Sequence, residues 1–124
     1  MARHNDLGAW GENIAREYLI TRGYTIIEHD TRMGHYEIDI IALKGNRIIF
    51  IEVKTRLAGS FDPLEAITPK KISNICRAAD SFVRRYNYPH EVQFDVIAIT
   101  GSPDTSWEIE HIPDAFVPPL GGYR

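Results

Sequence analysis

The sequence predicts a single α/β domain with a mixed central sheet flanked by helices. Two amphipathic helical patterns and five extended apolar runs follow one another in the order helix, three strands, helix, two strands. The hairpins in this order are antiparallel, whereas the second helix can carry a parallel crossover, so the sheet should be mixed. A chain of 124 residues fills one core and not two. We expect the core over about residues 6–112, followed by a tail over residues 113–124.

The composition is that of a globular protein and excludes several classes. Hydrophobic residues make up 44% of the chain and charged residues 25%, which argues against disorder. No apolar stretch approaches the roughly 20 residues of a membrane-spanning helix, and the N-terminus does not resemble a signal peptide. The lone Cys76 can form neither an internal disulfide nor a Cys-rich zinc site, so a reducing, cytoplasmic setting is expected.

The formal net charge of −3 argues only weakly against a nucleic-acid partner. Proteins that coat DNA are normally basic. Residues 1–100, however, carry 13 acidic and 13 basic residues, so the acidic excess lies in residues 101–124. A metal ion bound among the acidic residues of the neutral part would leave the surrounding surface effectively basic.

The first helix is expected from about Asp6 to Arg22. Asn5 or Asp6 can cap its N-terminus, and Gly23 follows where a left-handed residue usually ends a helix. Glu12 falls at the edge of the apolar arc, where the buried face meets solvent. Two glycines inside the helix each cost about 1 kcal/mol relative to Ala and would permit close approach of another element: Gly8 and Gly11.

Three strands are expected next, then a second helix and two more strands. The strand ranges are 24–29, 36–43, 47–55, 92–100 and 107–112. Gly45-Asn46 is a typical two-residue hairpin turn between the second and third strands. The second helix should begin with Thr68 as cap and Pro69 at its first position, and it should bury Cys76 in its apolar face. The longest loop is expected over residues 57–68.

The central hairpin carries the most informative side chains. If Gly45-Asn46 is the turn, Asp39 lies opposite Glu52 and Glu37 lies opposite Lys54. One face of the hairpin is then apolar near the turn and charged at its open end. The other face is wholly apolar, which indicates that both faces are covered. Its residues are Ile38, Ile40, Ala42, Ile49, Ile51 and Val53.

Two interpretations of the charged end are open at this point. Asp39 and Glu52 would have side-chain origins about 5 Å apart, and like charges placed directly opposite destabilise a sheet. A divalent cation held by both carboxylates would remove this conflict, because magnesium prefers oxygen ligands. Alternatively, the carboxylates belong to a structural charge network with Lys54.

Four motifs of the chain match those of one bacterial family. They are Gly8-x-x-Gly11-Glu12, Glu37-Ile38-Asp39-Ile40-Ile41-Ala42, Phe50-Ile51-Glu52-Val53-Lys54-Thr55-Arg56 and Phe94-Asp95-Val96. In this order they resemble the YraN-like family, small bacterial proteins predicted to be endonucleases. That family is distantly similar to archaeal Holliday-junction resolvases within the restriction-endonuclease-like superfamily. The resemblance runs from about Gly8 to Phe116, and it departs from the family at Tyr36, where Gly is usual.

The resemblance implies a restriction-endonuclease-like αβββαβ core with the site on the central hairpin. Asp39 and Glu52 would hold magnesium or manganese, with Glu12 and the carbonyl of Val53 as further ligands. Lys54 would orient the attacking water or stabilise charge on the phosphate, while the metal would lower the pKa of its bound water. The implied activity is hydrolysis of phosphodiester bonds in DNA, by analogy branched DNA. Resolvase relatives act as dimers, so a homodimer is also implied.

Basic residues outside the hairpin are candidates for binding nucleic acid. Lys70, Arg77 and Arg84 repeat every seven residues and form a stripe opposite the apolar face of the second helix. Lys71 flanks this stripe. Such a stripe either is simply solvated or follows a DNA backbone. Arg56, just after the proposed site, either contacts phosphate or faces solvent.

Several further features have two readings each. Glu37 either assists the site or pairs with Lys54, and Asp95 is either a buried polar anchor or a ligand. The apolar segment 115–120 either serves an interface or packs on its own domain. The histidines show no metal-ligand spacing.

Two functions compete on the sequence alone. The leading one is a magnesium- or manganese-dependent DNA endonuclease. The alternative is a non-catalytic module that binds DNA structures or other partners and retains the nuclease fold. Cleavage and mobility-shift assays on the same DNA separate the two.

Overall fold

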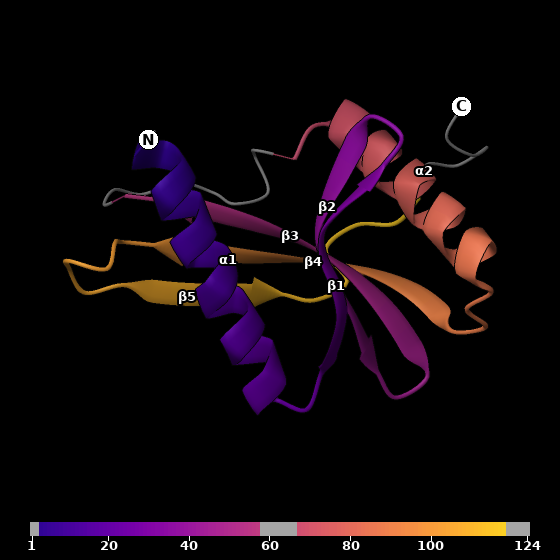
Figure 1. Ribbon diagram of the computed structural model, residues 1–124, viewed down its shortest axis with the longest axis horizontal. Helices are drawn as coiled ribbons and strands as arrows, with labels where there is room; N and C mark the ends of the chain where they lie inside the picture. The colour runs from indigo at the N-terminus through magenta and orange to yellow at the C-terminus, as the bar shows by residue number, and fades with distance from the viewer. Residues whose placement is uncertain (1–2, 58–66, 119–124) are drawn as a thin grey trace.

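The computed structural model describes residues 3–57 and 67–118 and contains two helices and one five-stranded sheet. The elements are α1 (Arg3–Thr21), β1 (Thr25–Met33), β2 (Tyr36–Lys44), β3 (Arg47–Arg56), α2 (Pro69–Tyr86), β4 (Glu91–Thr100) and β5 (Glu108–Ile112). The strand order in the sheet is β1-β2-β3-β4-β5. Helix α1 lies over one face and α2 packs on the other (Figure 1).

The sheet is mixed, as predicted. Strands β3 and β4 run parallel, and the other neighbouring strands run antiparallel. Helix α2 connects β3 to β4 and supplies the crossover that a parallel pair requires. The α/β prediction is confirmed, and the arrangement is consistent with a restriction-endonuclease-like fold. Across the described ranges, neither helix is long and apolar enough to cross a membrane.

Helix α1 begins earlier than predicted and ends at Thr21, one residue before the predicted end. It already includes residues 3–5, so the expected cap at Asn5 or Asp6 was wrong. An acidic residue is favourable throughout the first turn because of the helix dipole, so Asp6 could not locate the first residue. At the other end Gly23 adopts a φ of 89°, and the N–H of Tyr24 donates to the carbonyl of Leu19 at 3.0 Å.

Gly11 is the point at which α1 approaches the sheet. A Cβ atom at this position would overlap the hydroxyl of Thr55 on β3. At Gly8, by contrast, an added Cβ would have no described atom within 4 Å. Of the two glycines, therefore, Gly11 makes the expected close approach and Gly8 does not. The absence of a side chain at Gly11 therefore brings the adjacent Glu12 close to the end of β3.

Two apolar clusters cover the two faces of the sheet. Phe50, Phe82 and Phe94 belong to the cluster under α2. Ile38 packs in this cluster, whereas Ile40 packs with α1 on the opposite face. The expectation that Ile38 and Ile40 share one face was therefore wrong, because the alternation of β2 is interrupted at Asp39.

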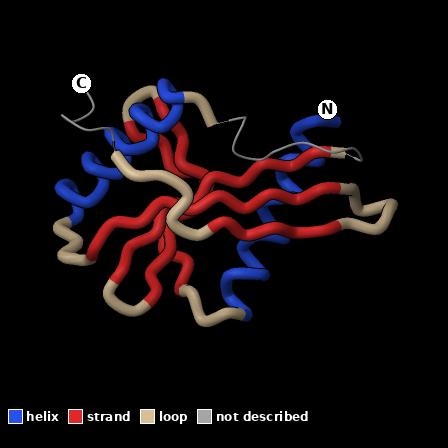
Figure 2. The backbone as a smooth tube through the Cα atoms, turned by 180° about the vertical axis from the view of Figure 1, so that it is seen from behind, coloured by secondary structure: helices blue, strands red, loops and turns tan. Residues whose placement is uncertain are grey.

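The interruption coincides with a fork in the sheet. The ladder between β2 and β3 runs from Lys44–Arg47 to Ile40–Ile51, in the register that the predicted turn requires. Beyond Ile40, β2 turns with β1 toward α2, while β3 continues beside β4 beneath α1; Figure 2 shows the same divergence from behind. The predicted partners Asp39–Glu52 and Glu37–Lys54 lie beyond this described ladder and are not paired in it.

Helix α2 and the C-terminal segment complete the domain. Thr68 caps α2 as predicted, since its hydroxyl accepts from the N–H of Lys71 at 3.1 Å. The tail returns to the domain: the N–H of Ala115 donates to the carbonyl of Phe94, and the ring of Phe116 stacks on that of Phe94 at 5.2 Å. The end of the apolar segment 115–120 and most of the predicted loop 57–68 lie outside the described residues.

Candidate active site

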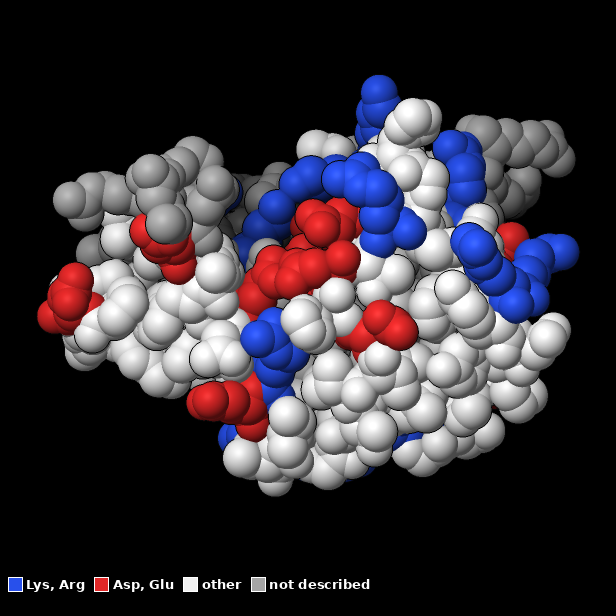
Figure 3. Space-filling view, viewed as in Figure 1, with Lys and Arg blue, Asp and Glu red and all other residues white. Residues whose placement is uncertain are grey.

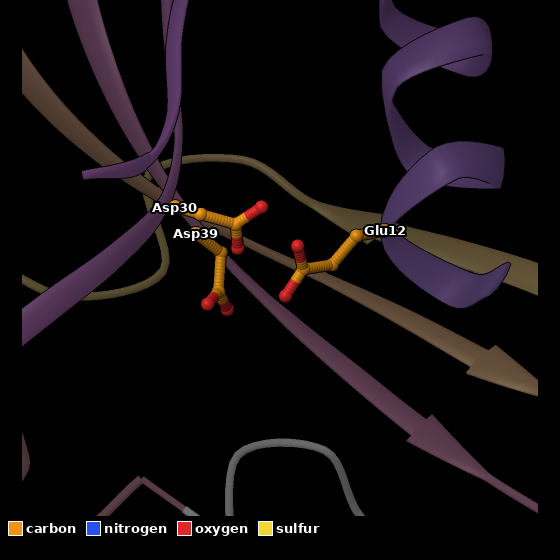
Figure 4. Close-up of side chains that lie close together, drawn as sticks. All are labelled: Glu12, Asp30 and Asp39. Atoms are coloured by element: carbon orange, nitrogen blue, oxygen red, sulfur yellow. The ribbon is translucent and has the colours of Figure 1, made fainter. Parts of the chain in front are cut away.

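Acidic side chains from three elements meet where β2 and β3 separate. One carboxylate oxygen from each of Glu12, Asp30 and Asp39 lies within 4.8 Å of the other two. Figure 4 shows these side chains pointing toward one another from α1, β1 and β2. We call this group the acidic cluster. Two of its members, Glu12 and Asp39, were predicted as site residues from the sequence.

The fork itself holds Asp39 in place. Its Oδ2 accepts a hydrogen bond from the backbone N–H of Val53 at 2.8 Å. Val53 lies beyond Ile51, the last residue of β3 in the ladder with β2, so the carboxylate of Asp39 takes the place of a strand acceptor. Val53 thus contributes its N–H to the site, and its carbonyl as a metal ligand stays a prediction.

Glu52 is held through both of its carboxylate oxygens. The hydroxyl of Tyr36 donates to Oε1 at 2.9 Å, and Nζ of Lys54 lies 3.5 Å from Oε2. The side chains of Glu52 and Lys54 are only 11% and 17% exposed, so solvent screens this ion pair weakly. Lys54 therefore pairs with Glu52, while Glu37 is exposed and lies opposite Arg32 on β1.

Two of the three members of the acidic cluster have raised pKa values. Burial, followed by the charge of Glu52, raises the pKa of Asp39 to about 7. Burial, followed by a hydrogen bond with Asp30 and the charge of Asp39, raises the pKa of Glu12 to about 8. Burial alone would raise the pKa of Asp30 as well, but hydrogen bonds with Glu12 and His29 bring it below its ordinary value.

Asp30 is the member of the cluster that sequence reasoning missed. We expected the first strand to end at His29, but β1 continues to Met33. The pairs His29–Ile40 and Thr31–Ile38 flank Asp30, so it lies across from Asp39, with a φ of 52° that Asp tolerates better than most residues. The missed signal was Gly34-His35, a second two-residue turn, in which Gly34 has a φ of 64°.

Comparison with known proteins identifies the family. The profile described as "Uncharacterised protein family UPF0102" matches residues 11–99, a range that contains every member of the acidic cluster. The chain belongs to the UPF0102 family. The YraN-like resemblance of the motifs is thereby confirmed.

Relatives of the same family match almost the whole chain. A UPF0102 protein of Bacteroides thetaiotaomicron is 43% identical over 121 residues, which cover 97% of this chain and 99% of the relative. One from Parabacteroides distasonis is 42% identical over 120 residues, with 96% and 98% coverage. One from Christiangramia forsetii is 43% identical over 117 residues, with 94% and 98% coverage. The similarity therefore extends over both helices and all five strands.

Basic side chains border the acidic cluster of this UPF0102 protein. Figure 3 shows them as a blue arc along one edge of the central red patch. Lys71, at the start of α2, lies close enough to Lys54 that the second ammonium group lowers the pKa of Lys71, and burial lowers it further. Helix α2 thus adds the cation of Lys71 to the site. From the sequence, Lys71 was expected only to flank the basic stripe of this helix.

The stripe on α2 is exposed as predicted. Lys70, Arg77 and Arg84 are all exposed. Arg84 forms an ion pair with Asp80 at 2.9 Å, one helical turn earlier, which is common for a solvated helix face. Arg56 is exposed at the end of β3. Whether these residues contact DNA stays a prediction.

A second buried aspartate has a different environment. Asp95 on β4 is fully buried, and its Oδ1 accepts from the Gln93 amide and from the N–H of Asp114, each at 2.9 Å. Its Oδ2 lies 2.7 Å from Nε2 of His111, whose Nδ1 lies 3.1 Å from the Tyr18 hydroxyl. Both oxygens of Asp95 therefore have hydrogen-bond partners within the domain, which supports its reading as a polar anchor.

Proposed function

We propose that this UPF0102 protein is a metal-dependent endonuclease that hydrolyses phosphodiester bonds in DNA. The observation that carries the proposal is the convergence of Glu12, Asp30 and Asp39 within 4.8 Å beside the Glu52–Lys54 pair. Ionising all three carboxylates at this spacing would destabilise the metal-free fold, and a bound cation would remove that cost. The family motifs on Glu12, Asp39 and the Glu52–Lys54 pair support the same chemistry.

The residues at the fork fit a magnesium or manganese ion. Every donor is a carboxylate oxygen, the ligand type that these hard cations prefer. One oxygen from each of the three residues lies within 4.8 Å of the other two, a spacing that one such cation could bridge. Asp39, Glu12 and Asp30 would hold the ion, and Glu52, whose charge acts on Asp39, would lie near it. Such an ion polarises a phosphoryl oxygen and lowers the pKa of the attacking water.

The remaining side chains have distinct roles in this proposal. Lys54 stabilises the negative charge that develops on the phosphate, since its ammonium is largely shielded from solvent and held beside Glu52. Tyr36 orients Glu52 through its hydroxyl. Lys71 adds a second cation at the same edge and attracts the phosphate backbone. The exposed stripe on α2 extends this attraction, and by analogy with resolvases we propose branched DNA as substrate and a homodimer as the active form.

Cleavage assays test the proposal directly. Purified protein is incubated with a four-way junction, a flap and a linear duplex, with magnesium, with manganese and with EDTA. We expect metal-dependent nicks in wild type and at least a hundredfold slower cleavage in Asp39→Asn, because this change removes a ligand and leaves the fold intact. Glu37→Gln is the matched control, since Glu37 is exposed and outside the cluster.

Two results would contradict the proposal. Product without metal, or equal product from Asp39→Asn, would mean that the acidic cluster does not support the reaction. Tight junction binding by wild type with no cleavage under any metal would favour the non-catalytic DNA-binding module instead.

A further inference from the structure

A hollow of about 330 Å³ lies between the β1–β2 turn and helix α2. Gly34 and Tyr36 line it from the hairpin, and Asn74, Arg77 and Ser81 line it from the helix. Its volume is at the lower end of the range for small-molecule sites. The hollow is therefore large enough for one nucleotide and too small for a duplex.

Tyr36 links the hollow to the acidic site. It is one of the lining residues, and its hydroxyl donates to Glu52 at 2.9 Å. On α2, Lys71 beside the site is followed at helical spacing by Asn74 and Ser81. A strand whose phosphate lies at the acidic cluster would thus meet the hollow next along this face of the helix.

The lining offers the groups that recognise a nucleotide out of its stack. Arg77 supplies a guanidinium for phosphate, and Asn74 and Ser81 supply hydrogen-bonding groups for a base edge or sugar. Tyr36, half-buried against the apolar cluster under α2, adds an aromatic side chain to the lining, and aromatic side chains are common partners of unstacked bases. Bases within a duplex are stacked inside and cannot enter a hollow of this kind unless they are flipped out.

We propose that this hollow receives one unpaired nucleotide of the DNA strand that is cut. The inference rests on the proposed function, because it takes the acidic cluster as the place of the scissile phosphate. It makes DNA with unpaired nucleotides, such as flaps, junction centres and single strands, the preferred substrate class over continuous duplex.

Binding in the absence of metal tests the hollow separately from cleavage. The anisotropy of a labelled 12-residue thymidine oligonucleotide and of a blunt 12-base-pair duplex is measured in EDTA at low salt. We expect wild type to bind the oligonucleotide about tenfold more tightly than the duplex. Ser81→Trp, which fills the hollow, should weaken oligonucleotide binding about tenfold and leave duplex binding within about twofold. Ser81→Ala removes the hydroxyl but leaves the hollow open, so it should weaken oligonucleotide binding by no more than about threefold and leave duplex binding unchanged.

A pair of arginine variants gives a second, independent test of whether the hollow binds the oligonucleotide. Arg77→Ala and Arg84→Ala remove the same charge from the same stripe, but only Arg77 lines the hollow. We expect Arg77→Ala to weaken oligonucleotide binding more than duplex binding, and Arg84→Ala to weaken both equally. This pair decides the question if Ser81→Trp does not fold.

The outcomes separate the hollow from the nuclease proposal. The proposal that the hollow binds a nucleotide is wrong if Ser81→Trp and Ser81→Ala bind the oligonucleotide equally well. It is also wrong if the two arginine variants have equal effects, even where wild type cleaves DNA. The expected affinities in a protein that cleaves nothing would support the hollow as a binding site and overturn the nuclease proposal alone.

Discussion

Asp39 and Asp95 are two aspartates of one sheet with opposite surroundings. Asp95 is fully buried, and donors from Gln93, Asp114 and His111 reach both of its oxygens. Asp39 receives the N–H of Val53, but its other close neighbours include carboxylates. The first arrangement stabilises the fold without any ligand. The second is stable only at a cost that a bound cation would remove, which is the usual sign of a functional site.

The difference follows from the place of each residue in the sheet. Asp95 lies in a strand that is paired along its length with β3, so fixed neighbours surround it. Asp39 lies at the fork, where the ladder between β2 and β3 has ended and acidic side chains from α1, β1 and β2 meet. Catalytic groups need such a break in strand pairing because the substrate must reach them.

The largest expected effect is the loss of stability when the hydrogen bonds around Asp95 are removed. Asp95→Ala leaves the Gln93 amide, the Asp114 N–H and His111 without their shared acceptor, so the free energy of unfolding should fall by about 4 kcal/mol. Urea denaturation at pH 7 measures this loss. A loss below about 1 kcal/mol would show that Asp95 is not the anchor we describe.

The pH dependence of stability should reveal the raised pKa values of the acidic cluster. Folded Asp39 and Glu12 hold protons up to pKa values of about 7 and about 8, whereas the unfolded chain releases them near pH 4. Raising the pH from about 5 to 8 should therefore lower the metal-free free energy of unfolding, by about 2–3 kcal/mol. Urea titrations in EDTA at each pH measure the slope. Glu12→Gln should make it clearly shallower; an unchanged slope would contradict the assignment.

Neutralising the centre of the cluster should stabilise the metal-free protein. Asp39→Asn keeps an acceptor for the Val53 N–H and removes one charge from the cluster, so unfolding at pH 8 in EDTA should require on the order of 2 kcal/mol more. Added magnesium should then stabilise wild type and not the variant. A clear loss of metal-free stability in Asp39→Asn would instead indicate a structural charge network.

The smallest effect is expected at the residue that departs from the family motif. Tyr36→Phe removes the hydrogen bond to Glu52 and keeps the ring, so stability should change by less than about 1 kcal/mol. Cleavage should slow about five- to tenfold because Glu52 is less well oriented, with KM for DNA unchanged. Steady-state cleavage kinetics separate the two parameters. A changed KM with normal kcat would assign Tyr36 to DNA binding alone.

The sequence by itself determined the elements and their order. Gly45-Asn46 set the register of the central hairpin, Thr68-Pro69 started α2, and Gly23 ended α1, because each of these signals acts through local backbone geometry. The motif residues Glu12 and Asp39 were also recognisable, and the structure brings their carboxylates together.

The tertiary structure decided which charges meet. A second tight turn placed Asp30 in the acidic cluster, and the packing of α2 brought Lys71 to Lys54. The antiparallel pairing of β5 with β4 brought His111 to Asp95. The fork at Asp39 was likewise invisible in the alternation pattern, because strand divergence depends on what packs on each half of the hairpin. Contacts between elements far apart in the chain depend on packing and not on local spacing, so the sequence identified part of the site and the fold completed it.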